Sequence, residues 1–211
     1  MTKTAGLTGD GGQRPAGTLL HPLGSIIEPL DLGCVFPGAQ PVEVELGSGD
    51  GSFLVEYARR HPERNFLGIE RLLGRIQKMS RKGLRAGLSN LRGMRIESSY
   101  LLEYLLPKRS IAALHIYFPD PWPKRKHREN RLINDRFPRL AKGVLVDGGP
   151  VYLRTDDEDY YKQMREVFAA ASGLFREHET PADLKGVLTD FEKEFNARGI
   201  PTLSLAYRAN K

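Results

Sequence analysis

From residue 41 to residue 208 the chain alternates short apolar runs with longer amphipathic stretches. The apolar runs are rich in Val, Ile, Leu and Phe, which is typical of buried strands. The stretches between them repeat apolar residues at helical spacing. Strands separated by helices need crossover connections, and these build a mostly parallel sheet with helices on both faces. The pattern therefore predicts an α/β protein with a doubly wound sheet.

The expected elements can be placed along the chain. Seven strands are expected, at residues 42–46, 66–70, 91–96, 111–118, 150–154, 174–179 and 203–208. Helices are expected at residues 52–61, 71–86, 100–106, 130–142 and 158–171, with a last one around Phe191 and Phe195. Residues 1–17 are rich in Gly and Thr and lack periodicity, so a disordered or irregular tail is expected before a single domain at residues 18–211.

Composition narrows the class of protein. The 211 residues include 32 Lys and Arg against 26 Asp and Glu, a net charge of +6 that favours an acidic partner such as nucleic acid. The single cysteine, Cys34, excludes an intrachain disulfide and a Cys-rich metal site. We find no apolar run of membrane-spanning length and no signal-peptide core, so we expect a cytoplasmic protein without a metal or a membrane partner. Monomer and homodimer both remain open.

Carboxylates follow five of the expected strands. In sheets of this kind, ligands bind beyond the carboxyl ends of the strands, near the point where the strand order reverses. The strand ends are therefore where a site is expected. The acids at these ends are Glu45, Glu70, Glu97, Asp120 and Asp156.

A glycine-rich turn follows the first expected strand and indicates a nucleoside-bearing cofactor. Residues 47–51 read Gly-Ser-Gly-Asp-Gly. Gly47, Gly49 and Gly51 let the backbone turn sharply and let a ligand approach closely. Glu70 stands nineteen residues beyond Gly51, at the end of the next strand, where a carboxylate can accept both hydroxyls of a ribose.

The charges around this turn favour a cationic ligand. Glu45 and Asp50 would repel a pyrophosphate, and the glycine spacing differs from the Gly-x-Gly-x-x-Gly of dinucleotide sites. S-adenosylmethionine has no phosphate and carries a sulfonium and an ammonium group, so we favour it over NAD. Glu97 can bind the adenine amino group in this architecture, although a surface glutamate also fits. Alternatively, Glu43 and Glu45 could simply lie on the solvent-exposed (wet) face of an edge strand.

The fourth expected strand ends in a stiff turn followed by cationic side chains. Three prolines within residues 119–123 prevent regular structure around Asp120 and Trp122, the only tryptophan of the chain. The basic residues that follow are Lys124, Arg125, Lys126 and Arg128. The arrangement predicts a reaction site beside a polyanion-binding site, and a loop of solvated charges is the simpler alternative. Trp122 could stack on a base, but we favour burial against the sheet edge.

These motifs resemble the bacterial tRNA (guanine-N7)-methyltransferase family. The string Phe-Pro-Asp-Pro-Trp-Pro-Lys at residues 118–124 is highly specific, and Thr155-Asp156 and Thr189-Asp190-Phe191-Glu192 follow it in the family's order. The resemblance runs from about residue 41 to residue 208. It implies a Rossmann-like class I methyltransferase that moves a methyl group from S-adenosylmethionine to N7 of guanosine-46 in the variable loop of tRNA.

The resemblance also implies roles for single residues. The family's S-adenosylmethionine contacts correspond to Glu45, Glu70, Glu97 and Asp120, and Asp120 also corresponds to its catalytic residue. Its substrate contacts correspond to Lys124, Asp156, Thr189, Phe191 and Glu192, and its RNA-interaction segment to residues 126–131 with Lys126, Arg128 and Arg131. The chain departs from the family at Glu97, where Asp or Asn is frequent, and at Arg128-Glu129-Asn130-Arg131, where the family often has paired basic residues.

The expected chemistry needs little acid–base work. Guanine N7 is a lone pair without a proton, so the enzyme must mainly place it in line with the sulfonium methyl. The Asp120 carboxylate is predicted to orient the guanine edge or to stabilise the growing positive charge.

Alternatives remain for several of these residues. Thr189 and Glu192 also match a helix capping box, and Asp156 could cap the helix that begins near residue 158. Phe191 and Phe195 are expected in the core. The chain could also be a methyltransferase of the same fold acting on another RNA base or on protein, or an RNA-binding module without activity.

Overall fold

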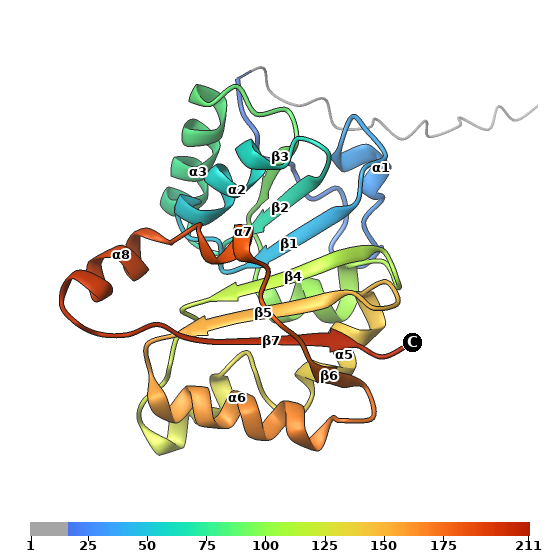
Figure 1. Cartoon of the computed structure of the whole chain (residues 1–211). Helices are drawn as coiled ribbons and strands as arrows, with labels where there is room; N and C mark the ends of the chain where they lie inside the picture. Colours follow the sequence, from blue (N-terminus) through green and yellow to red (C-terminus); the bar gives the residue numbers. More distant parts are fainter. Residues whose placement is uncertain (1–16) are drawn as a thin grey trace, which may run out of the picture.

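The computed structural model describes residues 17–211, and these form one seven-stranded sheet with helices on both faces (Figure 1). The strand order is β3-β2-β1-β4-β5-β7-β6. β7 runs antiparallel to both of its neighbours, and the other pairs are parallel. The strands are β1 Val42–Leu46, β2 Asn65–Ile69, β3 Leu91–Met94, β4 Ile111–Tyr117, β5 Pro150–Thr155, β6 Phe175–Glu177 and β7 Leu203–Ala209. The predicted mostly parallel, seven-stranded sheet is confirmed.

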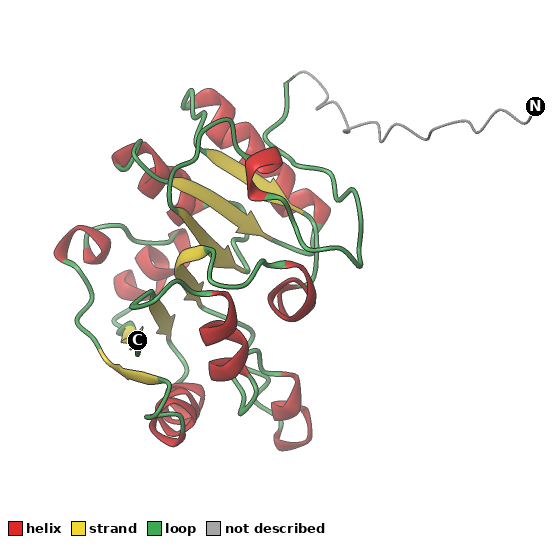
Figure 2. Cartoon of the chain, turned by 90° about the vertical axis from the view of Figure 1, so that its right-hand side faces the viewer, coloured by secondary structure: helices red, strands yellow, loops and turns green. Residues whose placement is uncertain are grey.

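Helices connect the strands and cover both faces of the sheet (Figure 2). The longer helices are α2 Ser52–Arg60, α3 Leu73–Arg85, α5 Phe137–Val144, α6 Glu158–Ala170 and α8 Asp190–Ala197. The short ones are α1 Leu32–Val35, α4 Ser98–Tyr100 with a π-helical continuation at Leu101–Leu105, a 3-10 helix at Arg125–Asn130 and α7 Ala182–Lys185. No helix within residues 17–211 combines the length and the apolar character needed to cross a membrane.

Two hydrophobic cores lie on opposite faces of the sheet. Residues of α2 and α3, such as Phe53 and Met79, pack with β2 on one face. Residues of α5 and α6, such as Phe137 and Phe168, pack with β1, β4 and β5 on the other face. Burying each large apolar side chain contributes roughly 1.5–3 kcal/mol, so both layers fix the strand ends firmly.

The helix predicted at residues 130–142 begins later than expected. Regular α-helix starts only at Phe137, with a proline in its first turn. Before it, the backbone N–H of Ile133 donates to the Tyr160 hydroxyl, and the Gln163 amide donates to the Ile133 carbonyl. Because α6 satisfies these backbone groups, the segment has no need of helical hydrogen bonds.

The N-terminal arm lies against the β3 edge of the sheet. Leu20 pairs with Gly93 of β3 as an isolated parallel bridge, and the backbone N–H of Leu19 donates to the Ser80 hydroxyl on α3. The predicted tail at residues 1–17 lies, apart from Gly17, outside the described residues.

Candidate active site

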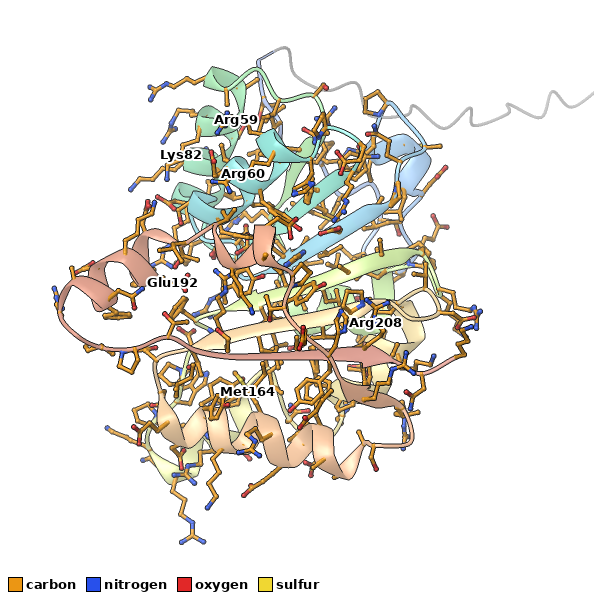
Figure 3. The ribbon with its side chains drawn as sticks, in the orientation of Figure 1. Arg59, Arg60, Lys82, Met164, Glu192 and Arg208 are labelled. Carbon is orange, nitrogen blue, oxygen red and sulfur yellow. The ribbon has the colours of Figure 1, made fainter. Side chains whose placement is uncertain are left out.

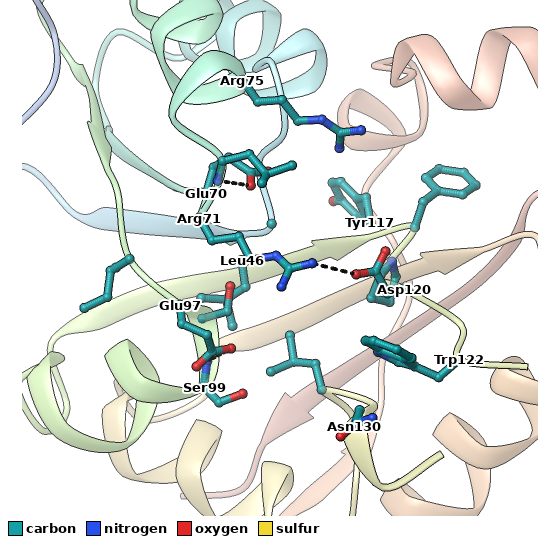
Figure 4. Close-up of a pocket in the computed structure, with 17 residues that line it drawn as sticks. Leu46, Glu70, Arg71, Arg75, Glu97, Ser99, Tyr117, Asp120, Trp122 and Asn130 are labelled. Atoms are coloured by element: carbon teal, nitrogen blue, oxygen red, sulfur yellow. Dashed lines mark hydrogen bonds and ion pairs between the residues drawn. The ribbon is translucent and has the colours of Figure 1, made fainter. Parts of the chain in front are cut away.

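The carboxyl ends of the parallel strands surround two neighbouring cavities. The first has a volume of about 290 Å³ and is lined by residues that include Glu70, Glu97 and Asp120 (Figure 4). The second has a volume of about 280 Å³ and is lined by residues that include Glu45 and Thr189. The residues that line both are Gly47, Arg75, Tyr117 and Phe118. The structure therefore brings most of the predicted site residues to one edge of the sheet.

The glycine turn between β1 and α2 has the backbone that only glycine adopts easily. Gly47, Gly49 and Gly51 have φ angles of 84°, 56° and 76°. A Cβ on Gly51 would lie 2.2 Å from the Cγ of Met79, so α3 also excludes a larger residue there. The N–H groups of Gly47 and Ser48 donate to the Ile69 carbonyl, which ties the turn to β2.

Glu45 is the most perturbed acid of the site. It is 3 % exposed, and one of its carboxylate oxygens, Oε2, is buried and has no hydrogen-bond partner among residues 17–211. Burial raises the pKa of Glu45 to about 8, with Asp50 and Glu70 adding to the rise and Arg154 opposing it. An unpartnered buried carboxylate at a cavity wall fits a ligand that brings a positive charge. The alternative that Glu43 and Glu45 mark a wet edge is wrong, because both are buried in the central β1.

Glu70 and Glu97 present carboxylates on the first cavity. Glu70 is 7 % exposed, and its Oε1 accepts the Leu72 N–H at 2.8 Å (Figure 4). Glu97 caps α4 and accepts the N–H groups of Ser99 and Tyr100 at 2.9 and 2.7 Å. Each carboxylate oxygen has a second lone pair, so both side chains are held in place and still able to accept from a ligand.

Asp120 lies on an exposed and strained turn across the first cavity. Its side chain is 72 % exposed, and its nearest cation is the Arg71 guanidinium at 3.8 Å (Figure 4). Within residues 17–211 three residues other than glycine have a positive φ, and two of them, Phe118 at 51° and Trp122 at 43°, flank Asp120. Such strain is concentrated at functional sites, where it holds a side chain in a required position.

Trp122 is neither fully buried against the sheet edge nor fully exposed for stacking on a base. It is half-buried and lines the first cavity, with its ring edge-on to His127 at 5.9 Å. Part of its indole face is therefore available to a ligand in the cavity. This position favours stacking more than the sequence alone did.

The segment after β6 is fixed to the sheet by a buried arginine that we did not single out from the sequence. Arg154, on β5, donates to the carbonyls of Leu184 and Val187 and to the Glu192 carboxylate, at 2.7–2.9 Å. Its guanidinium lies 4.5 Å from the ring centre of Tyr117, which lines both cavities. A charged residue within an otherwise apolar strand was the sequence signal that could have identified it.

The Thr189–Glu192 motif combines a structural role with a cavity position. The capping box is confirmed, since the Thr189 side chain accepts the Glu192 N–H and the Glu192 side chain accepts the Thr189 N–H. Glu192 is only 4 % exposed and paired with Arg154, which conflicts with its predicted direct contact to RNA. The prediction that Phe191 is core is wrong, because it is 51 % exposed and lines the second cavity beside Thr189.

Two acids, Asp156 and Asp157, follow β5, and the alternative that Asp156 caps α6 is wrong. Asp157, and not Asp156, caps α6 by accepting the Tyr160 N–H at 2.7 Å. Within the described residues no hydrogen bond or ion pair engages the Asp156 carboxylate, which is half-buried. Asp156 therefore remains available to a substrate.

The predicted RNA segment contains one residue that is misplaced for that task. Arg131 is 1 % exposed and donates to Pro121 O, Gln163 and Asp159, all at 2.7 Å. Arg131 therefore holds the proline turn in place through the Pro121 carbonyl. Its burial conflicts with the predicted contact to RNA phosphate. The exposed basic residues at positions 124–128 are Lys124, Arg125, Lys126 and Arg128, of which Arg128 pairs with Asp159.

Comparison with known proteins agrees with this geometry. The family described as "Putative methyltransferase" matches residues 39–205. A tRNA (guanine-N(7)-)-methyltransferase of Syntrophotalea carbinolica is 34% identical over 189 residues, which cover 88% of this chain and 82% of the relative. The chain belongs to the tRNA (guanine-N7)-methyltransferase family. Another member, from Aeromonas hydrophila, is 38% identical over 69% of this chain and 62% of its own length.

Solved structures support the fold of this methyltransferase. The crystal structure of the 16S rRNA methyltransferase KamB matches with a TM-score of 0.56 at 19% identity, covering 82% of this chain and 89% of that chain. At this identity the likeness concerns the α/β fold alone. Within residues 17–211 we find no group of three or more His, Cys, Asp or Glu side chains placed to hold a metal ion.

Proposed function

We propose that this methyltransferase transfers a methyl group from S-adenosylmethionine to N7 of a guanine in tRNA, at guanosine-46 of the variable loop. The observation that carries the proposal is the arrangement of Glu45, Glu70 and Glu97 around the glycine turn and the adjoining cavities. Glu45 offers an unpartnered buried oxygen to a cation, and Glu70 and Glu97 offer fixed acceptors to a ribose and to an amino group.

The residues of the first cavity would hold the nucleoside part of the donor. Glu70 accepts from the ribose hydroxyls, and Glu97 accepts from the adenine amino group. Glu45 and the glycine turn, at the second cavity, receive the cationic amino-acid part. When bound, S-adenosylmethionine supplies the activated methyl group.

The residues on the α8 side of the second cavity would hold the guanine, beside the amino-acid part of the donor. Phe191 presents an exposed ring on which the base can stack, and Thr189 provides a polar group near its edge. Asp156, which directly follows β5, is proposed to provide a second polar group. Asp120 faces the site from the strained turn and stabilises the positive charge that the guanine gains. No residue needs to remove a proton, because N7 attacks with its lone pair and the chain's task is alignment.

The choice of tRNA as substrate rests on the names of the relatives and on the cationic segment. The relatives from S. carbinolica and A. hydrophila are both described as tRNA (guanine-N(7)-)-methyltransferases. Lys124 and Lys126 are exposed directly after the turn that carries Asp120, where they can bind phosphates next to the reacting base.

The test is methylation of an unmodified tRNA transcript with labelled S-adenosylmethionine. Nucleoside mass spectrometry and borohydride–aniline scission should locate N7-methylguanosine at guanosine-46, and a transcript with adenosine at that position should accept no methyl group. Label in ribosomal RNA or in protein, but not in tRNA, would instead support a methyltransferase of the same fold with another substrate. Donor binding without transfer to any of the three acceptors would contradict the proposal.

A further inference from the structure

Helix α3 carries an unusual concentration of positive charge. Residues 71–96 contain eight Lys and Arg and no Asp or Glu. Surface helices ordinarily mix both signs, since like charges at i,i+3 and i,i+4 repel one another. The basic residues of α3 and its approach are Arg71, Arg75, Lys78, Arg81, Lys82 and Arg85.

Most of this charge is exposed and has no acidic partner. Lys82 is paired with Asp50 at 2.8 Å and with Asp190 at 3.7 Å, and Arg71 has Asp120 at 3.8 Å. In the part of the chain that the structure describes, the remaining four basic residues of the helix form no ion pair. These four are Arg75, Lys78, Arg81 and Arg85, and all are exposed.

The position of α3 relates this charge to the active site. Arg75, seen in Figure 4, lines both cavities. Lys78 lines the second cavity. α3 then continues away from the strand ends along the outside of the molecule, next to α2 (Figures 1 and 3). The cationic residues therefore form a surface that begins at the cavity and extends outward over about three helical turns.

The sheet topology places α3 opposite the cationic segment already described. α3 follows β2, and the Lys124–Arg128 segment follows β4. In the sheet, β2 and β4 lie on either side of β1, whose end carries the glycine turn. Two cationic elements thus flank the place where the methyl group is transferred.

We infer that the exposed face of α3 is a second phosphate-binding surface for the tRNA whose guanine enters the cavity. The inference rests on the proposed tRNA substrate. A folded RNA presents phosphates on both sides of a base that is exposed to an enzyme, and a single cationic segment reaches only one side. Phosphate contacts from α3 and from residues 124–128 together fix the orientation of the RNA across the cavity without reading its sequence.

The experiment measures how tRNA affinity depends on salt. Arg81 and Arg85 are suitable for substitution, because they lie beyond the cavity-lining residues. The matched control is Lys108→Ala/Arg176→Ala, which removes two exposed cations that line neither cavity. Lys108 precedes the amino end of β4, and Arg176 lies on the edge strand β6. A third variant, Lys124→Ala/Lys126→Ala, removes the predicted contacts on the other side.

The logarithm of the affinity falls as the logarithm of the salt concentration rises, and each lost phosphate contact makes this slope less steep by roughly 0.7–0.9. Here, a lower or reduced slope means a less steep one. Arg81→Ala/Arg85→Ala should therefore lower the slope by about 1.4–1.8. The fourfold change from 50 to 200 mM salt should then weaken wild-type binding roughly sevenfold to twelvefold more than it weakens the variant. Donor binding by calorimetry should stay unchanged, and the control should keep the wild-type slope.

A wild-type slope for Arg81→Ala/Arg85→Ala, with the Lys124→Ala/Lys126→Ala slope reduced, would overturn the inference while leaving the proposed function intact. Equal slope losses in Arg81→Ala/Arg85→Ala and in the control would also overturn it, because the binding would then follow net charge rather than position. If wild-type protein bound tRNA but never methylated guanine N7, the proposed function would fail. A reduced slope for the α3 variant would even then assign the surface to RNA.

Discussion

Replacing Glu45 with Gln tests the role of the buried carboxylate. In the free protein, burial raises the pKa of Glu45 to about 8. A protonated Glu45 cannot pair with the positive charge of S-adenosylmethionine, so the donor must bind the fraction of molecules in which Glu45 is ionised. That fraction is about one eleventh at pH 7 and about nine tenths at pH 9 for a group with this pKa.

The contribution of Glu45 to donor affinity should therefore rise roughly tenfold between pH 7 and pH 9. The amino group of the donor titrates in the same range, so the informative quantity is the ratio of wild-type to Glu45→Gln affinity, measured by calorimetry at each pH. We expect this ratio to grow with pH and to reach roughly 10–150, the equivalent of a charge-assisted hydrogen bond of about 1.5–3 kcal/mol. A ratio that does not change with pH would refute the reasoning.

Glu45 should affect folding stability in the opposite direction to donor affinity as the pH rises. The folded pKa of Glu45, about 8, lies above its unfolded value of roughly 4.3, so its contribution to stability is complete below the unfolded pKa and is lost as the pH rises through 8. At pH 9 the wild-type protein must keep this charge buried, and Glu45→Gln should unfold with a free energy roughly 3–5 kcal/mol larger. Urea denaturation at pH 5 and pH 9 checks this, because the gain should fall to about 1 kcal/mol at pH 5.

Three further substitutions test other parts of the site. Phe191→Ala should raise the KM for tRNA roughly fivefold to 150-fold through lost stacking and leave the melting temperature unchanged, since the ring is exposed; a normal KM would exclude a stacking role. Arg154→Met should cost about 3–5 kcal/mol of stability by leaving Glu192 buried and unpaired, and Arg154→Met/Glu192→Gln should recover part of that loss in a thermal melt. Asp120→Ala should lower kcat on the order of a hundredfold with normal folding, and near-normal turnover would exclude it from catalysis.

The fold was largely predictable because its signals are local. The apolar runs, the glycine turn and the spacing to Glu70 lie within short stretches, and strand–helix alternation leaves few topologies open. The strands fell close to their expected positions for this reason. The prediction of a helix from residue 130 was wrong because side chains of α6, some thirty residues further along the chain, hold that segment in a non-helical conformation.

The roles of single polar residues were less predictable, since they depend on distant partners. Arg131 looks like part of the cationic segment, yet contacts to Asp159 and Gln163 bury it. Phe191 has the spacing of a core residue, but its side of α8 faces the second cavity. The role of Arg154 was not predicted from the sequence, because its hydrogen-bond partners come from a segment about thirty residues away.

A crystal structure with S-adenosylhomocysteine, the demethylated product, would test most directly whether these acids form the donor site. We predict the amino group of the ligand within hydrogen-bonding distance of Glu45 Oε2, to which no described residue is hydrogen-bonded, and the ribose hydroxyls on Glu70. A ligand bound away from this edge of the sheet, or no ligand at saturating concentration, would contradict it.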